Sequence, residues 1–261
     1  MMMHNFKIAT WNVNSLRVRL PQVLTWLAKT KPDVLAIQET KLPDMNFPLE
    51  DITQAGYHAV YSGQNTYNGV AILSREQLPT DVIKDIPGFD DIQRRILSVS
   101  VGNIRILNIY VPNGESIVSN KYQYKLHWLT KIKEFLKNEL AQHSKMIVLG
   151  DFNIAPTELD VYDPNAWEGH VLCSKAERQS FQALLTLGLH DCFREFAPDQ
   201  KAYSWWDYRL NAFKRNMGLR IDHILANTRL FSCCKYCQID KSTRAWERPS
   251  DHAPVVAEFT L

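Results

Sequence analysis

Short apolar runs and longer amphipathic stretches alternate along the chain, which predicts strands interleaved with helices. The apolar runs are rich in Val, Ile and Leu and are bounded by Pro, Gly, Asn or Asp, as buried strands are. The predicted strands cover residues 6–11, 34–38, 60–61, 70–74, 95–101, 104–110, 146–149, 203–206, 219–225 and 255–260.

Apolar residues at helical spacing predict helices over residues 19–28 and 119–142, each with one apolar face. A further helix is expected to begin after Ser174, because Ser174 and Glu177 have the spacing of a capping box, and to stop at Gly188. The pair Gly102-Asn103 lies between two predicted strands and indicates a hairpin turn.

The order of these elements favours a layered α/β sandwich, with helices packed outside sheets, over a doubly wound nucleotide-binding fold. Hairpin-linked strands are mixed with long helices, and no glycine-rich phosphate loop follows a strand. The 261 residues contain no repeat at solenoid period and no linker rich in Pro, Gly or Ser. One domain spanning residues 1–261 is therefore the expected organisation.

Composition limits the classes of partner. No apolar run approaches the roughly 20 residues of a membrane span, and residues 1–7 lack the charged and apolar regions of a signal peptide. A cytoplasmic protein without membrane contact is expected. The net charge of +2 allows a nucleic-acid partner without implying one. A local basic surface for such a partner could still form, from Lys121, Lys125, Lys131, Lys133 and Lys137.

Five cysteines, an odd number, suit a reducing compartment. Cys234 and Cys237 have C-x-x-C spacing, which leaves a zinc or redox site open. No second pair supplies the other ligands of a structural zinc, so the favoured interpretation is small apolar side chains in the core.

Polar side chains cluster where the predicted strands end. Carboxylates, amides, a phenol and an imidazole that converge in a cleft would suit Mg²⁺ or Mn²⁺ over zinc, because their donors are mostly oxygen. A metal held by carboxylates, together with an Asp that orients water and a His, is equipment for phosphoester hydrolysis. Taken singly, each residue also fits a turn or a satisfied core position. The set is Asn12, Asn14, Glu39, Tyr110, Asn113, Asp151, Asn153, Asp222, Asp251 and His252.

The sequence blocks around these residues resemble the exonuclease III family of AP endonucleases, within the endonuclease/exonuclease/phosphatase superfamily. The blocks occur in family order from residue 6 to the C-terminus. They are Trp11-Asn12-Val13-Asn14-Ser15, Leu35-Ala36-Ile37-Gln38-Glu39-Thr40-Lys41, Tyr110-Val111-Pro112-Asn113-Gly114, Gly150-Asp151-Phe152-Asn153, Gly218-Leu219-Arg220-Ile221-Asp222-His223 and Ser250-Asp251-His252-Ala253-Pro254. The resemblance implies a four-layer α/β sandwich with two central mixed sheets, and Mg²⁺-dependent hydrolysis of DNA backbone phosphates.

The resemblance also implies roles for single residues. Glu39 would hold the metal with Asn12 and Asp251 close by, and the wider set of candidate ligands adds Asp151, Asn153 and His252. Asp151 would orient or deprotonate the attacking water, and Asn153 would position it. Tyr110 and His252 would contact the scissile phosphate, with Asp222 fixing the imidazole. Asn113 is a further candidate for contact with substrate.

The segment from Tyr203 to Arg209 is similar to the family's aromatic segment beside the abasic sugar. Trp205, Trp206, Leu219 and Ile221 would line that pocket, and plain core packing is the alternative for the two tryptophans. Two features depart from the family pattern. His223 adds a second imidazole, and the loop over residues 163–173 does not align with relatives that cut abasic sites.

The leading hypothesis is a monomeric DNA-repair nuclease that cuts double-stranded DNA 5′ to abasic sites and processes 3′ ends. The balance between these activities stays open. A superfamily phosphatase acting on small phosphoesters is the alternative enzyme. A non-catalytic DNA-binding module is the alternative from another class, but it gives no reason for Asp151, Asp222 and His252 to occur together.

Overall fold

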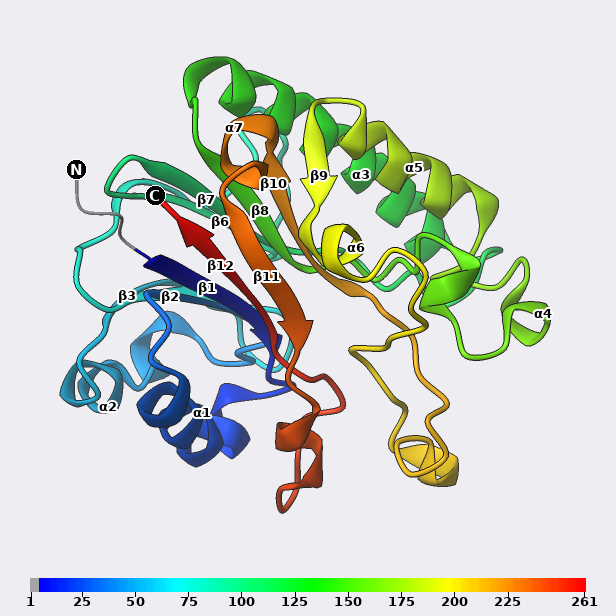
Figure 1. The fold of residues 1–261 in the computed structure, drawn as a ribbon, viewed down its shortest axis with the longest axis horizontal. Coiled ribbons are helices and arrows are strands. Elements are labelled where there is room, and N and C mark those ends of the chain that lie inside the picture. Colours follow the sequence, from blue (N-terminus) through cyan, green and yellow to red (C-terminus); the bar gives the residue numbers. More distant parts are fainter. Residues whose placement is uncertain (1–4) are drawn as a thin grey trace.

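The computed structural model describes residues 5–261, so Met1 to His4 of the stretch without signal-peptide features lie outside the described residues. Within the described chain the strands form two six-stranded mixed sheets (Figure 1). The first has the order β11-β12-β1-β2-β4-β3, from β1 (Asn5–Asn12), β2 (Val34–Gln38), β3 (His58–Ser62), β4 (Val70–Ser74), β11 (Cys234–Ile239) and β12 (Val255–Thr260). The second has the order β5-β6-β7-β8-β10-β9, from β5 (Thr80–Ile83), β6 (Ile96–Val101), β7 (Ile104–Tyr110), β8 (Met146–Asp151), β9 (Leu189–Asp191) and β10 (Asp222–Asn227).

Helices cover the outer faces of both sheets and complete four layers (Figure 1). Helices α1 (Leu16–Thr30) and α2 (Leu49–Gln54) pack on the first sheet, and α3 (Asn120–Gln142) and α5 (Lys175–Leu185) pack on the second. The central apolar layer lies between the two sheets, where Ile8 and Ile147 belong to one cluster. The short helices are α4 (Pro164–Trp167), α6 (Cys192–Phe196), α7 (Thr228–Phe231) and the 3₁₀ turns η1 (Asp44–Asn46), η2 (Glu158–Asp160), η3 (Arg209–Asn211) and η4 (Lys241–Ala245).

Most predicted elements are confirmed, and β2, β4 and β7 have the predicted bounds. The Ser119 hydroxyl caps α3 by accepting a hydrogen bond from the Tyr122 amide. Ser174 and Glu177 form the predicted capping box of α5. The hairpin turn joins β6 to β7, and Cys192 and Cys237 fill the core between the sheets.

Two predictions are wrong. Residues 203–206 form a loop with isolated bridges from Trp205 to Leu219 and His252, because no neighbouring strand continues the ladder there. Lys125 does not belong to a basic surface, because its side chain is fully buried against Glu177. It lies on the core face of α3, three residues after the buried Tyr122.

Strand register brings the polar strand ends together. Asn12 is opposite Gln38 in the parallel pair of β1 and β2, which places Glu39 beside Asn12. In the second sheet, Asp151 is opposite Tyr110 on one side and Asp222 on the other. The same end of each sheet therefore presents carboxylates.

Buried amides connect the two sheets just below this end. Gln38 Nε2 donates to Asn108 Oδ1 of the second sheet at 2.7 Å and to Thr10 Oγ1 at 2.9 Å. Asn108 Nδ2 donates in turn to the carbonyl oxygens of Ile37 and Ala71, at 2.9 and 2.8 Å. All four side-chain N–H donors of the two amides are thereby paired, so these bonds fix how the sheets face each other.

Gly150 is required where β8 approaches its end. Its φ is +144°, and a Cβ atom there would lie 1.9 Å from the Ile109 carbonyl oxygen. Only glycine permits this close contact between β7 and β8, and Asp151 follows directly.

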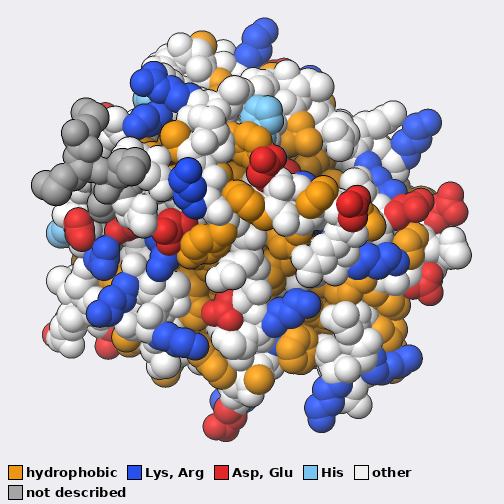
Figure 2. All heavy atoms as spheres, viewed as in Figure 1, with side chains coloured by type: hydrophobic (Ala, Val, Ile, Leu, Met, Phe, Trp, Pro, Cys, Tyr) orange, Lys and Arg blue, Asp and Glu red, His pale blue; other side chains and the backbone are white. Residues whose placement is uncertain are grey.

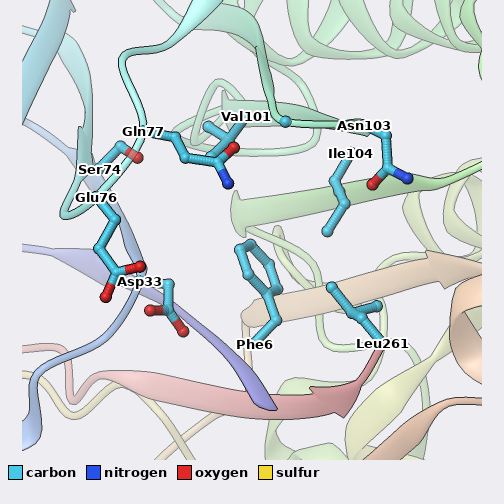
Figure 3. Close-up of a pocket in the computed structure, with 10 residues that line it drawn as sticks. Phe6, Asp33, Ser74, Glu76, Gln77, Val101, Asn103, Ile104 and Leu261 are labelled. Carbon is cyan, nitrogen blue, oxygen red and sulfur yellow. The ribbon is translucent and has the colours of Figure 1, made fainter. Parts of the chain in front are cut away.

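A cavity of about 270 Å³ opens at the opposite end of the strands, between the hairpin at Gly102 and the C-terminal Leu261 (Figure 3). It contains none of the candidate catalytic residues. On the face drawn in Figure 2, basic and acidic side chains are interspersed. Among the described helices, none combines the length and the apolar character that crossing a membrane requires.

The unexpected imidazole, His223, is a core residue of β10. Its ring packs against Phe152 and Phe181, with centroids 5.2 and 4.9 Å away. Nε2 lies 2.9 Å from the Ile154 carbonyl oxygen, while Nδ1 is buried without a partner. Burial, helped by the nearby Arg220, lowers the pKa of His223 to about 4, because a second N–H would have no acceptor.

This buried ring predicts a pH-dependent stability. Between pH 6.5 and 4 His223 is protonated in the unfolded chain but neutral in the folded chain. The free energy of unfolding therefore falls as the pH drops through this window. Relative to His223→Gln, the wild type should lose about 2 kcal/mol more unfolding free energy between pH 7 and pH 5. Denaturant unfolding at both pH values measures this. His58→Gln, at an exposed histidine, is the control, and equal losses in wild type and His223→Gln would contradict the assignment.

Candidate active site

An imidazole–carboxylate pair forms one side of the site. His252 Nδ1 donates to Asp222, with distances of 2.9 Å to Oδ2 and 3.1 Å to Oδ1. Asp222 also accepts a 2.6 Å bond from the Ser204 hydroxyl, and both residues of the pair are buried. Burial opposes the charge on His252, but Asp222 and Asp151 outweigh it and raise its pKa to about 10. His252 is therefore an imidazolium, whose Nε2–H is available to donate.

Asp151 faces that Nε2–H, with Oδ2 at 3.8 Å from His252 Nε2. Its carboxylate accepts hydrogen bonds from Asn12 Nδ2 and from the Asn153 amide, both at 2.9 Å. Burial raises the pKa of Asp151 to about 7, with Asp222 adding to the shift and the His252 imidazolium opposing it. A carboxylate with such a pKa is suited to accept a proton near neutral pH.

Glu39 lies across from this pair at the end of β2. Its Oε1 accepts from Asn12 Nδ2 at 2.9 Å and from the Tyr110 hydroxyl at 3.0 Å, and Lys41 Nζ lies 2.7 Å from Oε2. Burial, followed by the charge of Glu39, raises the pKa of Tyr110 well above its usual value. Tyr110 therefore stays a neutral phenol that can donate.

Two asparagines complete this part of the site. Asn153 has a left-handed backbone (φ +48°) just after β8, which turns its side chain back toward Asp151. Its Nδ2 donates to the Val111 carbonyl at 2.9 Å, and its Oδ1 accepts from Asn113 Nδ2 at 3.2 Å. The two amide groups are therefore fixed relative to Asp151.

The donor set fits a hard divalent cation. Glu39, Asp151 and His252 each offer an atom, and these atoms lie within 4.8 Å of one another. The carboxylates are the suitable ligands for Mg²⁺ or Mn²⁺. His252 Nε2 is the nitrogen donor of the group, and its Nδ1–H is bound to Asp222. Asp251 lies at the rim, where it accepts 3.0 Å bonds from Trp205 Nε1 and Asn14 Nδ2.

These groups line one cleft of about 320 Å³. Trp205 and Ile221 line it as predicted, whereas Leu219 and Trp206 do not. Trp206 is fully buried and packs edge-on against Phe213, with centroids 5.1 Å apart, and Leu219 is buried beneath the cleft wall. The predicted pocket is thus half correct, because in an irregular loop the sequence does not show which neighbour points inward. The full lining is Glu39, Tyr110, Asn113, Asp151, Asn153, Trp167, Val171, Leu172, Trp205, Asp207, Arg209, Ile221, Asp251 and His252.

Several functional positions were missed from sequence. Ser204, which holds Asp222, and Asp207 and Arg209, which line the cleft, all lie in the aromatic segment 203–209. Their polar side chains, placed between aromatic residues, are a signal that was available. The unaligned loop 163–173 contributes Trp167, Val171 and Leu172 to the lining and therefore borders the entry to the site.

Comparisons with known proteins agree with this geometry. Residues 9–252 match the Endonuclease/Exonuclease/phosphatase family. Exodeoxyribonuclease III of Haemophilus influenzae is 36% identical, covering 97% of this chain and 99% of that protein. The structure of the 3′ phosphatase NExo from Neisseria, bound to a product DNA hairpin, has a TM-score of 0.96 and 49% identity, covering 97% of this chain and 99% of that one. An AP endonuclease from Archaeoglobus fulgidus has a TM-score of 0.94 and 38% identity, with the same coverage. The chain therefore belongs to the endonuclease/exonuclease/phosphatase family, and within it to the exodeoxyribonuclease III and AP endonuclease branch of hydrolases.

Proposed function

We propose that this chain is a DNA-repair phosphodiesterase that requires Mg²⁺ or Mn²⁺, cuts double-stranded DNA 5′ to abasic sites and processes 3′ ends. The observation that carries the proposal is the facing pair of Asp151 and His252, with Nε2 and Oδ2 3.8 Å apart inside a cleft. One group accepts a proton and the other donates to an anion, which is what attack of water on a phosphodiester requires.

The residues divide the work as follows. Asp151 accepts the proton of the attacking water, and the side chains of Asn153 and Asn113 orient it. The His252 Nε2–H and the neutral Tyr110 hydroxyl donate to the non-bridging oxygens of the phosphate, where negative charge develops. Asp222 keeps His252 protonated and oriented.

Glu39 would hold the cation, with Asn12, Asp151, Asn153 and Asp251 close by. A bound divalent cation supplies charge neutralisation for the phosphate. Burial raises the pKa of Asp151, and a cation bound close by would favour its charged carboxylate.

The relatives support DNA as the substrate and both kinds of cleavage. One solved relative is named a 3′ phosphatase and another an AP endonuclease. The cleft wall of Trp205, Ile221 and Leu172 would exclude a nucleotide that carries its base and admit a bare sugar or a 3′ end. A core shared by strands from Phe6 to Phe259 supports one domain over residues 1–261. A monomer in the cytoplasm stays a prediction from the sequence.

Rates on a substrate panel test the proposal directly. Abasic duplex, nicked duplex and duplex with a 3′ phosphate should all be turned over with Mg²⁺ or Mn²⁺, and chelation should abolish each activity. Glu39→Ala should raise the metal concentration required. Turnover of small phosphoesters with none on DNA would favour the phosphatase alternative, and full activity in chelator would contradict the metal requirement.

Asp151→Asn should lower kcat on abasic duplex by about three decades and leave DNA affinity nearly unchanged, because the carboxylate acts only in the transition state. His252→Ala should behave similarly. Single-turnover rates and a binding titration measure the two quantities. Asp199→Asn, at an exposed carboxylate in a turn, is the matched control. Near wild-type kcat in either active-site variant would refute the catalytic assignment.

Substitutions of the two neighbouring tryptophans should distinguish a residue of the cleft wall from a residue of the core. Trp205→Ala removes a wall residue and should lower abasic cleavage about tenfold more than removal of a 3′ phosphate, which needs no flipped sugar. Trp205→Phe keeps an aromatic ring in the wall but loses the bond to Asp251, so comparison with Trp205→Ala separates the wall from that bond. Trp206→Ala should instead cost about 3–5 kcal/mol of stability and lower both activities by the same factor. Equal losses of both activities in Trp205→Ala would remove Trp205 from the pocket.

A further inference from the structure

A buried ion pair lies directly behind the active site, and no catalytic step uses it. Lys125 of α3 and Glu177 of α5 have 0% side-chain exposure, and Lys125 Nζ lies 2.5 Å from Glu177 Oε1. Burying two charges is costly unless every polar atom is satisfied. The hydrogen-bond partners of this pair therefore show which parts of the active site it holds in place.

The Lys125 ammonium donates its other hydrogen bonds to main-chain carbonyl groups of the active site. Nζ donates to the carbonyl oxygen of Asn153 at 2.7 Å and to that of Asn113 at 3.1 Å. With Glu177, these acceptors use all three donors of an ammonium group. One charge thus fixes the main chain of Asn153, which bonds to Asp151, and of Asn113, which bonds to Asn153.

Glu177 extends the same unit to the wall of the cleft. Its Oε1 accepts from the Leu172 amide at 2.9 Å, and its Oε2 accepts from the amide and hydroxyl of Ser174, at 3.0 and 2.5 Å. Leu172 lines the cleft and has a left-handed backbone (φ +74°). The position of the wall is thereby linked to that of Asn153.

We propose that Lys125 and Glu177 are positioning residues, which hold the two asparagines and the Leu172 wall as one hydrogen-bonded unit around the scissile phosphate. This inference rests on the proposed function. The left-handed backbone of Asn153 costs free energy, so it needs strong contacts to hold it. A hydrogen bond from a charged ammonium to its carbonyl group is stronger than one from a neutral donor. A displacement of about 1 Å at such a residue lowers rate by about a hundredfold.

The test separates position from stability by two substitutions. Lys125→Met leaves Glu177 buried without its partner, so both stability and kcat should fall. Lys125→Met with Glu177→Gln removes both charges and keeps one side-chain oxygen as an acceptor, so stability should return part of the way to the wild-type value, since no buried charge is left without a partner. Because methionine cannot donate to the two carbonyls, kcat on duplex with a 3′ phosphate should stay about a hundredfold low, with KM changed by less than about threefold.

The control is another buried ion pair, which links β7 to the same helix α3. Arg105 and Glu139, 2% and 6% exposed with Nε and Oε2 2.5 Å apart, have no bond to an active-site residue. Arg105→Met should lose stability but keep wild-type kcat under conditions where the protein is folded. Recovery of kcat in the double variant, or an equal loss of kcat in Arg105→Met, would overturn the proposal. Inactivity of the wild-type protein on DNA would instead refute the proposed function.

Discussion

The hydrogen bonds of Gln38 and Asn108 across the central layer set the geometry on which the site depends. Each half of the site comes from a different sheet, and two sheets packed through apolar side chains alone can slide at little cost. Buried amides remove that freedom, because a shift would leave donors and acceptors unpaired. Glu39 follows Gln38 directly, and Tyr110 lies two residues beyond Asn108. The 3.0 Å bond between Tyr110 and Glu39 closes the same connection at the surface of the cleft.

Within this frame, burial assigns opposite roles to neighbouring groups. Asp222 is satisfied by Ser204 and His252, so it stabilises a cation at the imidazole. Burial raises the pKa of Asp151, because the amide donors of Asn12 and Asn153 and the more distant His252 offset the lost hydration of its charge only in part. The two environments shift the pKa values of neighbouring groups differently. One site can therefore hold a proton donor and a proton acceptor at the same pH.

The strand-end residues are predictable from the sequence, because apolar runs followed by polar residues have a periodicity that the sheets preserve. Prediction fails where this periodicity is absent. In the loop around Trp205 and Trp206, the choice of inward residue depends on the bridge to Leu219, which no local pattern encodes. The edge strand β11 was missed because its exposed positions and its bulge after Cys234 break the alternation. Lys125 was judged by its charge, whereas its spacing from Tyr122 and Leu129 placed it on the core face.

The pairing of β1 with β12 also has a consequence for the timing of synthesis. β1 is central in its sheet and pairs along its length with the last strand of the chain, from Asn5 with Thr260 to Thr10 with Val255. Asn12 and His252, from opposite ends of the chain, enter the site through this pairing. A nascent chain holds no complete site until the last strand has left the ribosome, since such distant contacts form only once both partners are free. A chain that lacks β12 therefore cannot assemble the site that would cut DNA.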